Sequence, residues 1–255
     1  MVATHRVEIG NVAFWNNWAS RENESRFLMN ELTEKQLQRI AVNQEDSILE
    51  IGPGSGRLTI PIAKIAKKIT VIEPSENMLS YLRVNADKEN LRNIVYINKS
   101  WEEVVIGKDV KQHDIVLASF SILMCDLRET LSKINRAAKK VVYIFASADD
   151  WMPEEIQRIV YGKRIMAEMT DHVIIFNMLS LLGIRTNVEI FDYLSKRRFT
   201  NFEEAVSDFM SIYNIPENKS EMVKQLLKRK LVSENGELLF LRKKKVAMIW
   251  WRHSY

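Results

Sequence analysis

The chain has 255 residues, 46% of them hydrophobic and 27% charged, with a formal net charge of +4. This is the composition of a soluble globular protein with one substantial core. No apolar run approaches the roughly 18 residues that a membrane span needs, and the first residues lack the apolar stretch of a signal peptide, so we expect a cytoplasmic protein without membrane association. Cys125 is the single cysteine, and the four histidines lack metal-ligand spacing, which predicts neither a disulfide nor a metal site.

Helical spacing of apolar residues marks residues 1–45 as a helical N-terminal cap. From Ser47 onward, short β-branched runs alternate with longer segments of helical spacing; the runs occupy residues 47–51, 69–73, 93–98, 114–119 and 141–147. This alternation is typical of βαβ units with a parallel sheet. Because the runs are apolar almost throughout, we expect helices on both faces of that sheet.

The chain after residue 150 adds further elements to this pattern. Residues 151–183 predict a helical insertion, and residues 187–199 alternate as a strand does. Two more helices follow, with Asn201 and Ser220 as expected caps. The end of the chain predicts two strands around a basic turn at residues 242–245, so antiparallel strands close the sheet. Residues 46–255 are expected to form one globular unit with the cap.

Three glycines, Gly52, Gly54 and Gly56, follow the first predicted strand. Such a turn lets a ligand approach the backbone at the edge where open α/β sheets bind small molecules. Arg57 stands where a dinucleotide-binding fingerprint has its third glycine, and no Lys-Ser or Lys-Thr of a nucleotide P-loop follows. Glu73 ends the next strand, about 20 residues beyond the first glycine, the distance at which an acid meets ribose hydroxyls.

The stretch "EIGPGSG", from Glu50 to Gly56, resembles the first motif of the class I S-adenosylmethionine-dependent methyltransferases. The resemblance implies a Rossmann-like α/β fold with a mostly parallel seven-stranded sheet and S-adenosyl-L-methionine as cofactor. It implies that the glycine turn approaches the amino-acid part of the cofactor, that Glu50 orders the turn, and that Glu73 binds the ribose. It also implies cofactor contacts after the second, third and fourth strands, at Pro74, Met78, Ser100, Trp101 and Ser119. Met78 and Trp101 are equally well explained as core residues.

The end of the fourth strand faces the transferred methyl group in this family, which implies that Ser119, Phe120 and Ser121 lie near the reaction centre. The chain has no N-P-P-Y or D-P-P-Y sequence there, the tetrapeptide of many methylases of exocyclic or amide nitrogen. A general base is needed only if the acceptor loses a proton. The candidate bases near this edge are Asp149, Asp150 and His172, and Ser119 and Ser121 are the other candidates for catalysis.

The cap and the insertion are expected to decide the substrate, because in small-molecule members of the family such elements cover the cofactor. Their candidate pocket residues, together with one from the fourth strand, are Phe14, Trp15, Trp18, Phe120, Trp151, Tyr161 and Arg164. These indicate a small-molecule acceptor under a helical lid. Three alternatives stay open: an RNA or protein methyltransferase using the basic C-terminal surface, a non-catalytic cofactor-binding module, and a nicotinamide-dependent oxidoreductase. The oligomeric state is not indicated.

Overall fold

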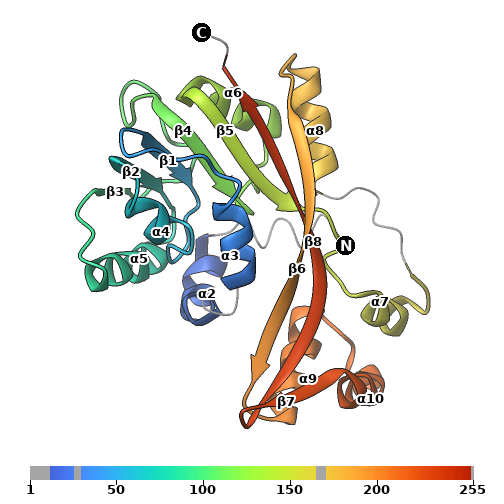
Figure 1. Ribbon diagram of the computed structural model, residues 1–255. Coiled ribbons are helices and arrows are strands. Elements are labelled where there is room, and N and C mark those ends of the chain that lie inside the picture. The colour runs from blue at the N-terminus through green and yellow to red at the C-terminus, as the bar shows by residue number, and fades with distance from the viewer. Residues whose placement is uncertain (1–11, 26–29, 165–170, 254–255) are drawn as a thin grey trace.

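A mixed sheet forms the centre of the computed structural model, which describes residues 12–25, 30–164 and 171–253 (Figure 1). The strand order is β3-β2-β1-β4-β5-β8-β6, and β7 pairs with β8 outside this path. β8 pairs antiparallel with β5, β6 and β7, and the other described strand pairs are parallel. The strands are β1 (Ser47–Ile51), β2 (Lys68–Ile72), β3 (Ile94–Ile97), β4 (His113–Ser119), β5 (Ala138–Ser147), β6 (Asn187–Phe199), β7 (Leu231–Glu234) and β8 (Glu237–Arg252).

Helices cover both faces of the sheet, as the apolar runs predict. The described helices are α2 (Val12–Ser25), α3 (Asn30–Leu37), α4 (Thr59–Ala63), α5 (Glu76–Lys88), α6 (Leu127–Ala137), α7 (Glu154–Tyr161), α8 (Asp171–Leu181), α9 (Phe202–Ile212) and α10 (Ser220–Lys230). Buried residues of α3, α4 and α5 pack on one face, and those of α6 and α8 pack on the other. The predicted fold class is therefore confirmed.

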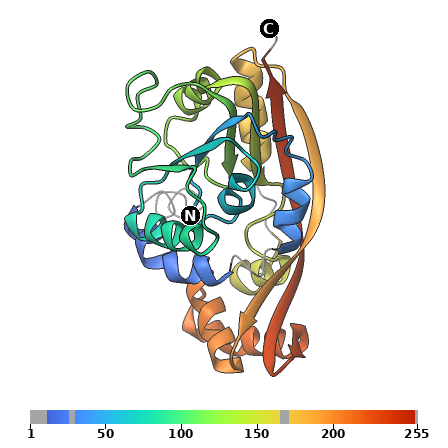
Figure 2. The same ribbon diagram turned by 60° about the vertical axis from the view of Figure 1, so that its left-hand side comes forward.

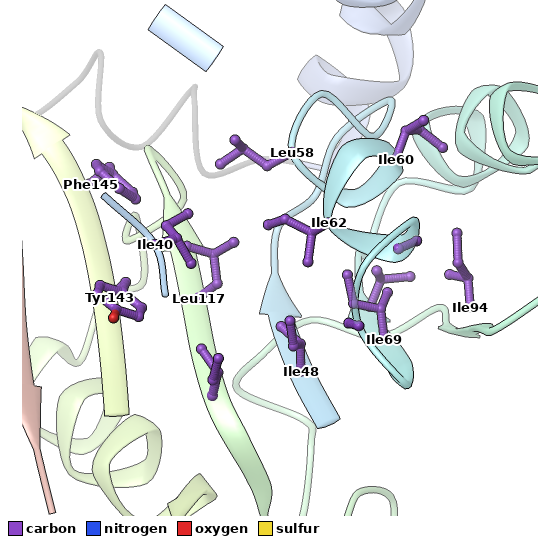
Figure 3. Close-up of a cluster of buried hydrophobic side chains, with 14 of the residues drawn as sticks. Ile40, Ile48, Leu58, Ile60, Ile62, Ile69, Ile94, Leu117, Tyr143 and Phe145 are labelled. Carbon is purple, nitrogen blue, oxygen red and sulfur yellow. The ribbon is translucent and has the colours of Figure 1, made fainter. Parts of the chain in front are cut away.

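Alternation along each strand divides the main core into two layers. Ile48, Ile69 and Leu117 face the layer under α4 and α5, where Figure 3 shows them beside Ile62. Their chain neighbours, such as Leu49, face α6 and α8. Successive strand residues point to opposite faces, so a strand buried on both sides must be apolar at every position.

β6 and β8 continue beyond the main sheet as a two-stranded ribbon (Figures 1 and 2). Their far ends carry α7, α9, α10 and β7 around a second hydrophobic core. Phe209 lies at its centre, with ring centroids 4.9 Å from Phe240 and 6.2 Å from Phe199. The predicted division into a cap (residues 1–45) and one further unit (residues 46–255) stays a prediction. Within the second of these, β6 and β8 each contribute residues to two separate cores.

The two N-terminal helices are held by side chains at specific points of the fold. On α2, Asn16 accepts a hydrogen bond from the Ser75 hydroxyl at 2.6 Å, at the start of α5. On α3, Lys35 donates to the Asp192 carbonyl at 2.7 Å and Glu31 accepts from the Leu194 amide at 3.2 Å. α3 thus satisfies backbone groups on the free edge of β6, which would otherwise be open to pairing.

Two local predictions for the C-terminal part are wrong. The basic run at residues 242–245 lies inside β8, and the turn before it falls at Asn235 and Gly236, which both have positive φ. The basic residues are tolerated in the strand because they sit where the ribbon has left the main core. Lys219 takes the N-cap position before α10 in place of Ser220, whereas Asn201 caps α9 by accepting from the Glu204 amide.

Candidate functional site

The glycine turn follows β1 at the point where the sheet order reverses between β1 and β4, the usual ligand crevice of such sheets. Gly52 and Gly56 have φ of +65° and +96°, values that side-chain-bearing residues rarely adopt. A Cβ atom on Gly52 would lie 2.4 Å from the Ser121 Cβ, and one on Gly56 would lie 2.2 Å from a Leu82 methyl. Glycine is therefore required at both positions by conformation and by contact.

Glu50 is buried beneath this turn, with only 2% of its surface exposed. Its carboxylate accepts a 2.6 Å hydrogen bond from the Thr59 hydroxyl at the start of α4. Burial raises the pKa of Glu50 to about 7, although the Thr59 hydrogen bond and the Arg57 charge act in the opposite direction. The residue ties β1 to α4 across the turn, which fits the ordering role that the sequence motif implies.

Glu73 ends β2 with its carboxylate directed at backbone amides. It accepts from the Ser75 amide at 3.0 Å and from the Gly54 amide at 3.3 Å. A carboxylate held at the tip of a glycine turn can accept hydrogen bonds from both hydroxyls of a ribose diol, so these residues fit the adenosyl part of S-adenosylmethionine. Pro74 follows directly and offers its carbonyl to the Asn98 amide group.

Three further predicted cofactor residues serve visible structural roles. Met78 and Trp101 are each 2% exposed, Met78 on α5 and Trp101 in the core under α6. The Lys133 ammonium lies over the Trp101 ring, 4.9 Å from the ring centroid. Ser100 binds Glu103 through its amide and its hydroxyl, both at 2.9 Å. Cofactor contacts by these residues stay predictions.

The end of β4 lies against the glycine turn, which brings the predicted reaction centre and the cofactor motif together. The Ser121 hydroxyl donates to the Ile51 carbonyl, directly below Gly52. Phe120 has φ of +56°, a backbone conformation that is an outlier for a bulky residue, and 38% of its surface is exposed. Its amide is fixed by the Phe145 carbonyl at 2.8 Å. The turn thus presents an aromatic ring beside Ser119, and such stored strain points to a functional position.

A polar network around Arg57 is the part of the site that sequence reasoning missed. The Arg57 guanidinium donates to the Ser119 hydroxyl at 3.2 Å and to the buried Gln36 at 2.7 Å, and Gln36 also donates to Ser119 at 3.1 Å. Thr33 accepts a further bond from Arg57 at 3.0 Å. The only signal in the sequence is that Arg57 stands in place of a glycine, because Thr33 and Gln36 are distant in the chain.

The three candidate bases lie near the end of β5: Asp149 and Asp150 follow it in the chain, and His172 contacts its last residue from α8. Asp149 accepts a hydrogen bond from the Lys245 amide, so its carboxylate fastens the loop after β5 to β8. The His172 Nδ1 lies 3.2 Å from the Ser147 carbonyl. A carbonyl can only accept, so the His172 Nδ1 donates this hydrogen bond. Their roles in catalysis stay predictions.

The predicted pocket residues fall in two groups. Phe14, Trp15 and Trp18 pack on one another along α2, with Phe14 and Trp18 stacked at 5.7 Å. Trp151 follows β5 with 45% of its surface exposed, and its ring lies 5.0 Å from that of Tyr213 in the second core. Tyr161 ends α7, and Arg164 lies 3.8 Å from Glu154 beyond it. The structure does not bring the two groups together.

Known proteins resemble this chain in sequence and in fold. Residues 48–141 match the family described as "Methyltransferase domain". The same fold is found in a SAM-dependent methyltransferase from Aquifex aeolicus, with a TM-score of 0.53, 18% identity and coverage of 69% of this chain and 90% of that one. The chain contains a methyltransferase domain over residues 48–141, and its fold supports membership of the class I S-adenosylmethionine-dependent type. Both findings support S-adenosylmethionine as the cofactor and favour an enzyme over the non-catalytic and nicotinamide alternatives.

Relatives of this methyltransferase leave its acceptor undefined. It is 27% identical over 217 residues to a protein of Haemophilus influenzae without a functional name, covering 84% of this chain and 79% of the relative. It is 23% identical over 245 residues to the ribosomal RNA small subunit methyltransferase A of Malacoplasma penetrans, covering 93% and 84%. No helix within the described parts of the methyltransferase is long and apolar enough to cross a membrane.

Proposed function

We propose that this methyltransferase acts on a small molecule held between the end of β4 and the second hydrophobic core. The observation that carries the proposal is Phe120, an exposed aromatic ring fixed in a left-handed turn beside Ser119. In Figure 1 the arrowheads of β4 and β5 point toward the part of the molecule that holds α7, α9 and α10. An acceptor at Phe120 would therefore have protein on more than one side, which favours a compact substrate.

The residues of the chain have positioning roles in this proposal. The bound cofactor supplies an electrophilic methyl group on a sulfonium, so the protein needs mainly to orient the acceptor and exclude water. Glu73 and the glycine turn hold the adenosyl end, whereas Arg57 and Gln36 fix the Ser119 hydroxyl on the side of the acceptor. Where the acceptor loses a proton, His172 is the candidate to receive it.

The cofactor site is tested by calorimetric titration with S-adenosylmethionine and S-adenosylhomocysteine. Glu73→Ala removes the proposed ribose contacts, and we expect it to weaken the binding of both ligands about a hundredfold or more. Glu76→Ala is the matched control, because Glu76 is exposed three residues further on and pairs only outward with Arg83. Equal binding by both variants would contradict the assignment of Glu73, and the thermal stability of each variant shows whether it is folded.

The acceptor class is tested with methyl-labelled S-adenosylmethionine and a cell extract divided into a small-molecule fraction and an RNA fraction. We expect label in the small-molecule fraction, and a smaller yield with Phe120→Ala. Label found only in RNA would overturn the proposal.

An RNA acceptor is the second candidate, supported by the ribosomal RNA methyltransferase among the relatives. Exposed basic residues of β6 and β8, such as Lys196 and Arg198, offer a surface for phosphates. Against it stands the sequence Ser119-Phe120-Ser121, which lacks the N-P-P-Y or D-P-P-Y pattern. Steep salt dependence of RNA binding would favour this candidate. A cytoplasmic location stays a prediction for either acceptor class.

A further inference from the structure

One face of the β6–β8 ribbon changes from apolar to cationic and back again. Alternate positions pair Phe191 with Val246 in the main core, then Tyr193 with Lys244, Ser195 with Arg242, and Arg197 with Phe240 in the second core. We call Tyr193, Lys244, Ser195, Arg242 and Arg197 the ribbon patch. The register is continuous, so all five side chains leave the same face of the ribbon.

The charges in the ribbon patch are not balanced. Arg197 pairs with Asp208, and Arg242 donates to the carbonyls of Asp150 and Trp151 at 2.7 and 3.1 Å. Lys244 is only partly exposed, and within residues 12–25, 30–164 and 171–253 it has no hydrogen bond or ion pair. A partly buried cation without a partner is costly, and a bound anion would remove that cost.

The surroundings of Lys244 support the same conclusion. Desolvation, with the charges of Arg242 and Arg197, lowers the pKa of Lys244 to about 8, and Asp149 offsets this only in part. The other groups that face Lys244 add little negative charge. Burial raises the pKa of Tyr193 and of Tyr213, so both phenols are neutral. The Asp208 carboxylate forms an ion pair with Arg197.

The ribbon patch also borders the site of methyl transfer. α3 connects the two places, because Gln36 donates to Ser119 at the end of β4 and the same helix binds the backbone of β6 on both sides of Tyr193. Arg57 also donates to Ser119. Cationic groups therefore continue from the reaction centre to the ribbon. A substrate with its reacting atom near Phe120 would bring its other end toward Lys244.

We infer that the ribbon patch binds a carboxylate or phosphate group of the acceptor, with Lys244 as its principal partner. The assignment of this anionic group to the methyl acceptor rests on the proposed function. Binding of an anion at the ribbon patch can be tested without turnover. An extended RNA strand suits the patch less well, because Lys244 is partly buried whereas RNA backbones are usually met by exposed cations.

The test compares Lys244→Met with Lys243→Met. Lys243 is the next residue, points to the opposite face and pairs with Asp192, so its variant removes the same charge outside the patch. Thermal unfolding of the full chain is followed against inorganic phosphate and, separately, acetate, at constant ionic strength with chloride. The two arms distinguish a phosphate from a carboxylate ligand.

We expect saturable stabilisation of the natural chain and of Lys243→Met by at least one of the two anions. In Lys244→Met the apparent affinity for that anion should fall about tenfold or more. No saturable effect in the natural chain, or an equal effect in both variants, would overturn the inference. The measurement needs no methyl acceptor, so failure of the acceptor assay alone leaves its result unchanged. Equal loss of RNA binding in both variants, without an anion effect, would instead point to a nucleic-acid surface.

Discussion

Glu50 is buried beneath the glycine turn, where it accepts a hydrogen bond from Thr59. Its pKa is raised above that of the unfolded chain, so the folded state retains a proton that the unfolded state loses. Stability from this group is present at low pH and is lost as the pH rises from about 4.5 to about 7. The free carboxylate is therefore expected to be a net cost at neutral pH.

Replacement Glu50→Gln tests this expectation. Between pH 5 and pH 8, without cofactor, the natural chain should lose about 3 kcal/mol of unfolding free energy through Glu50, and the variant should not. Urea unfolding at both pH values measures the difference, with Glu76→Gln as an exposed control. Parallel pH profiles of the natural chain and Glu50→Gln would contradict the pKa assignment.

The residues of the cofactor motif could be found from the sequence because they are local. Gly52, Gly56 and Glu73 follow strand ends at fixed spacing, and the structure gives each a physical reason. Arg57 with Gln36 could not be found, since their contact joins α3 to the glycine turn through tertiary packing. The left-handed backbone of Phe120 was equally hidden, because no propensity places an aromatic residue there.

Among the elements, α2 depends on a few polar contacts with α5. Asn16 binds Ser75 and Asn77, and Asn23 accepts from the buried Asn85, which also holds the Ser55 carbonyl in the glycine turn. Through Asn85 the helix is connected to the cofactor motif. Opening of α2 should therefore be governed by these contacts.

Asn16→Ala is expected to make α2 open more often, because it removes the side-chain acceptor for the Ser75 hydroxyl. Amide hydrogen exchange within residues 12–25 should rise about fivefold, while exchange in β1 and β4 stays unchanged. Asn17→Ala on the exposed side of the same helix is the control. Similar exchange in the two variants would show that Asn16 does not hold the helix.

Strands and helices were predictable where hydrophobic periodicity is strong, as in β1, β2, β4 and β5. The basic run at residues 242–245 predicts a turn from composition, but these residues lie within β8. Lys243 and Lys245 are in fact exposed on one face of β8, where charged residues are as acceptable as in any loop. Composition alone cannot distinguish a solvated strand face from a turn.

At the scale of the whole molecule, two cores share one sheet. Phe209 is fully buried in the second core, and Phe209→Ala should cost that core about 3–5 kcal/mol. We expect loss of exchange protection in α9 and α10, whereas β1 and β4 remain protected. Ser211→Ala, at an exposed position of the same helix, should change neither. Equal loss of protection in both cores would mean that they unfold as one unit.

The continuity of β6 and β8 has a consequence for how the molecule can be divided. Each strand contributes residues to the main core at one end and to the second core at the other, so no cut between the two cores spares both. A fragment ending before β6 would lack two strands of the main sheet, and a fragment beginning there would carry a half-exposed ribbon. We therefore expect neither half to fold as a separate module, because each would lack strands that its core shares with the other.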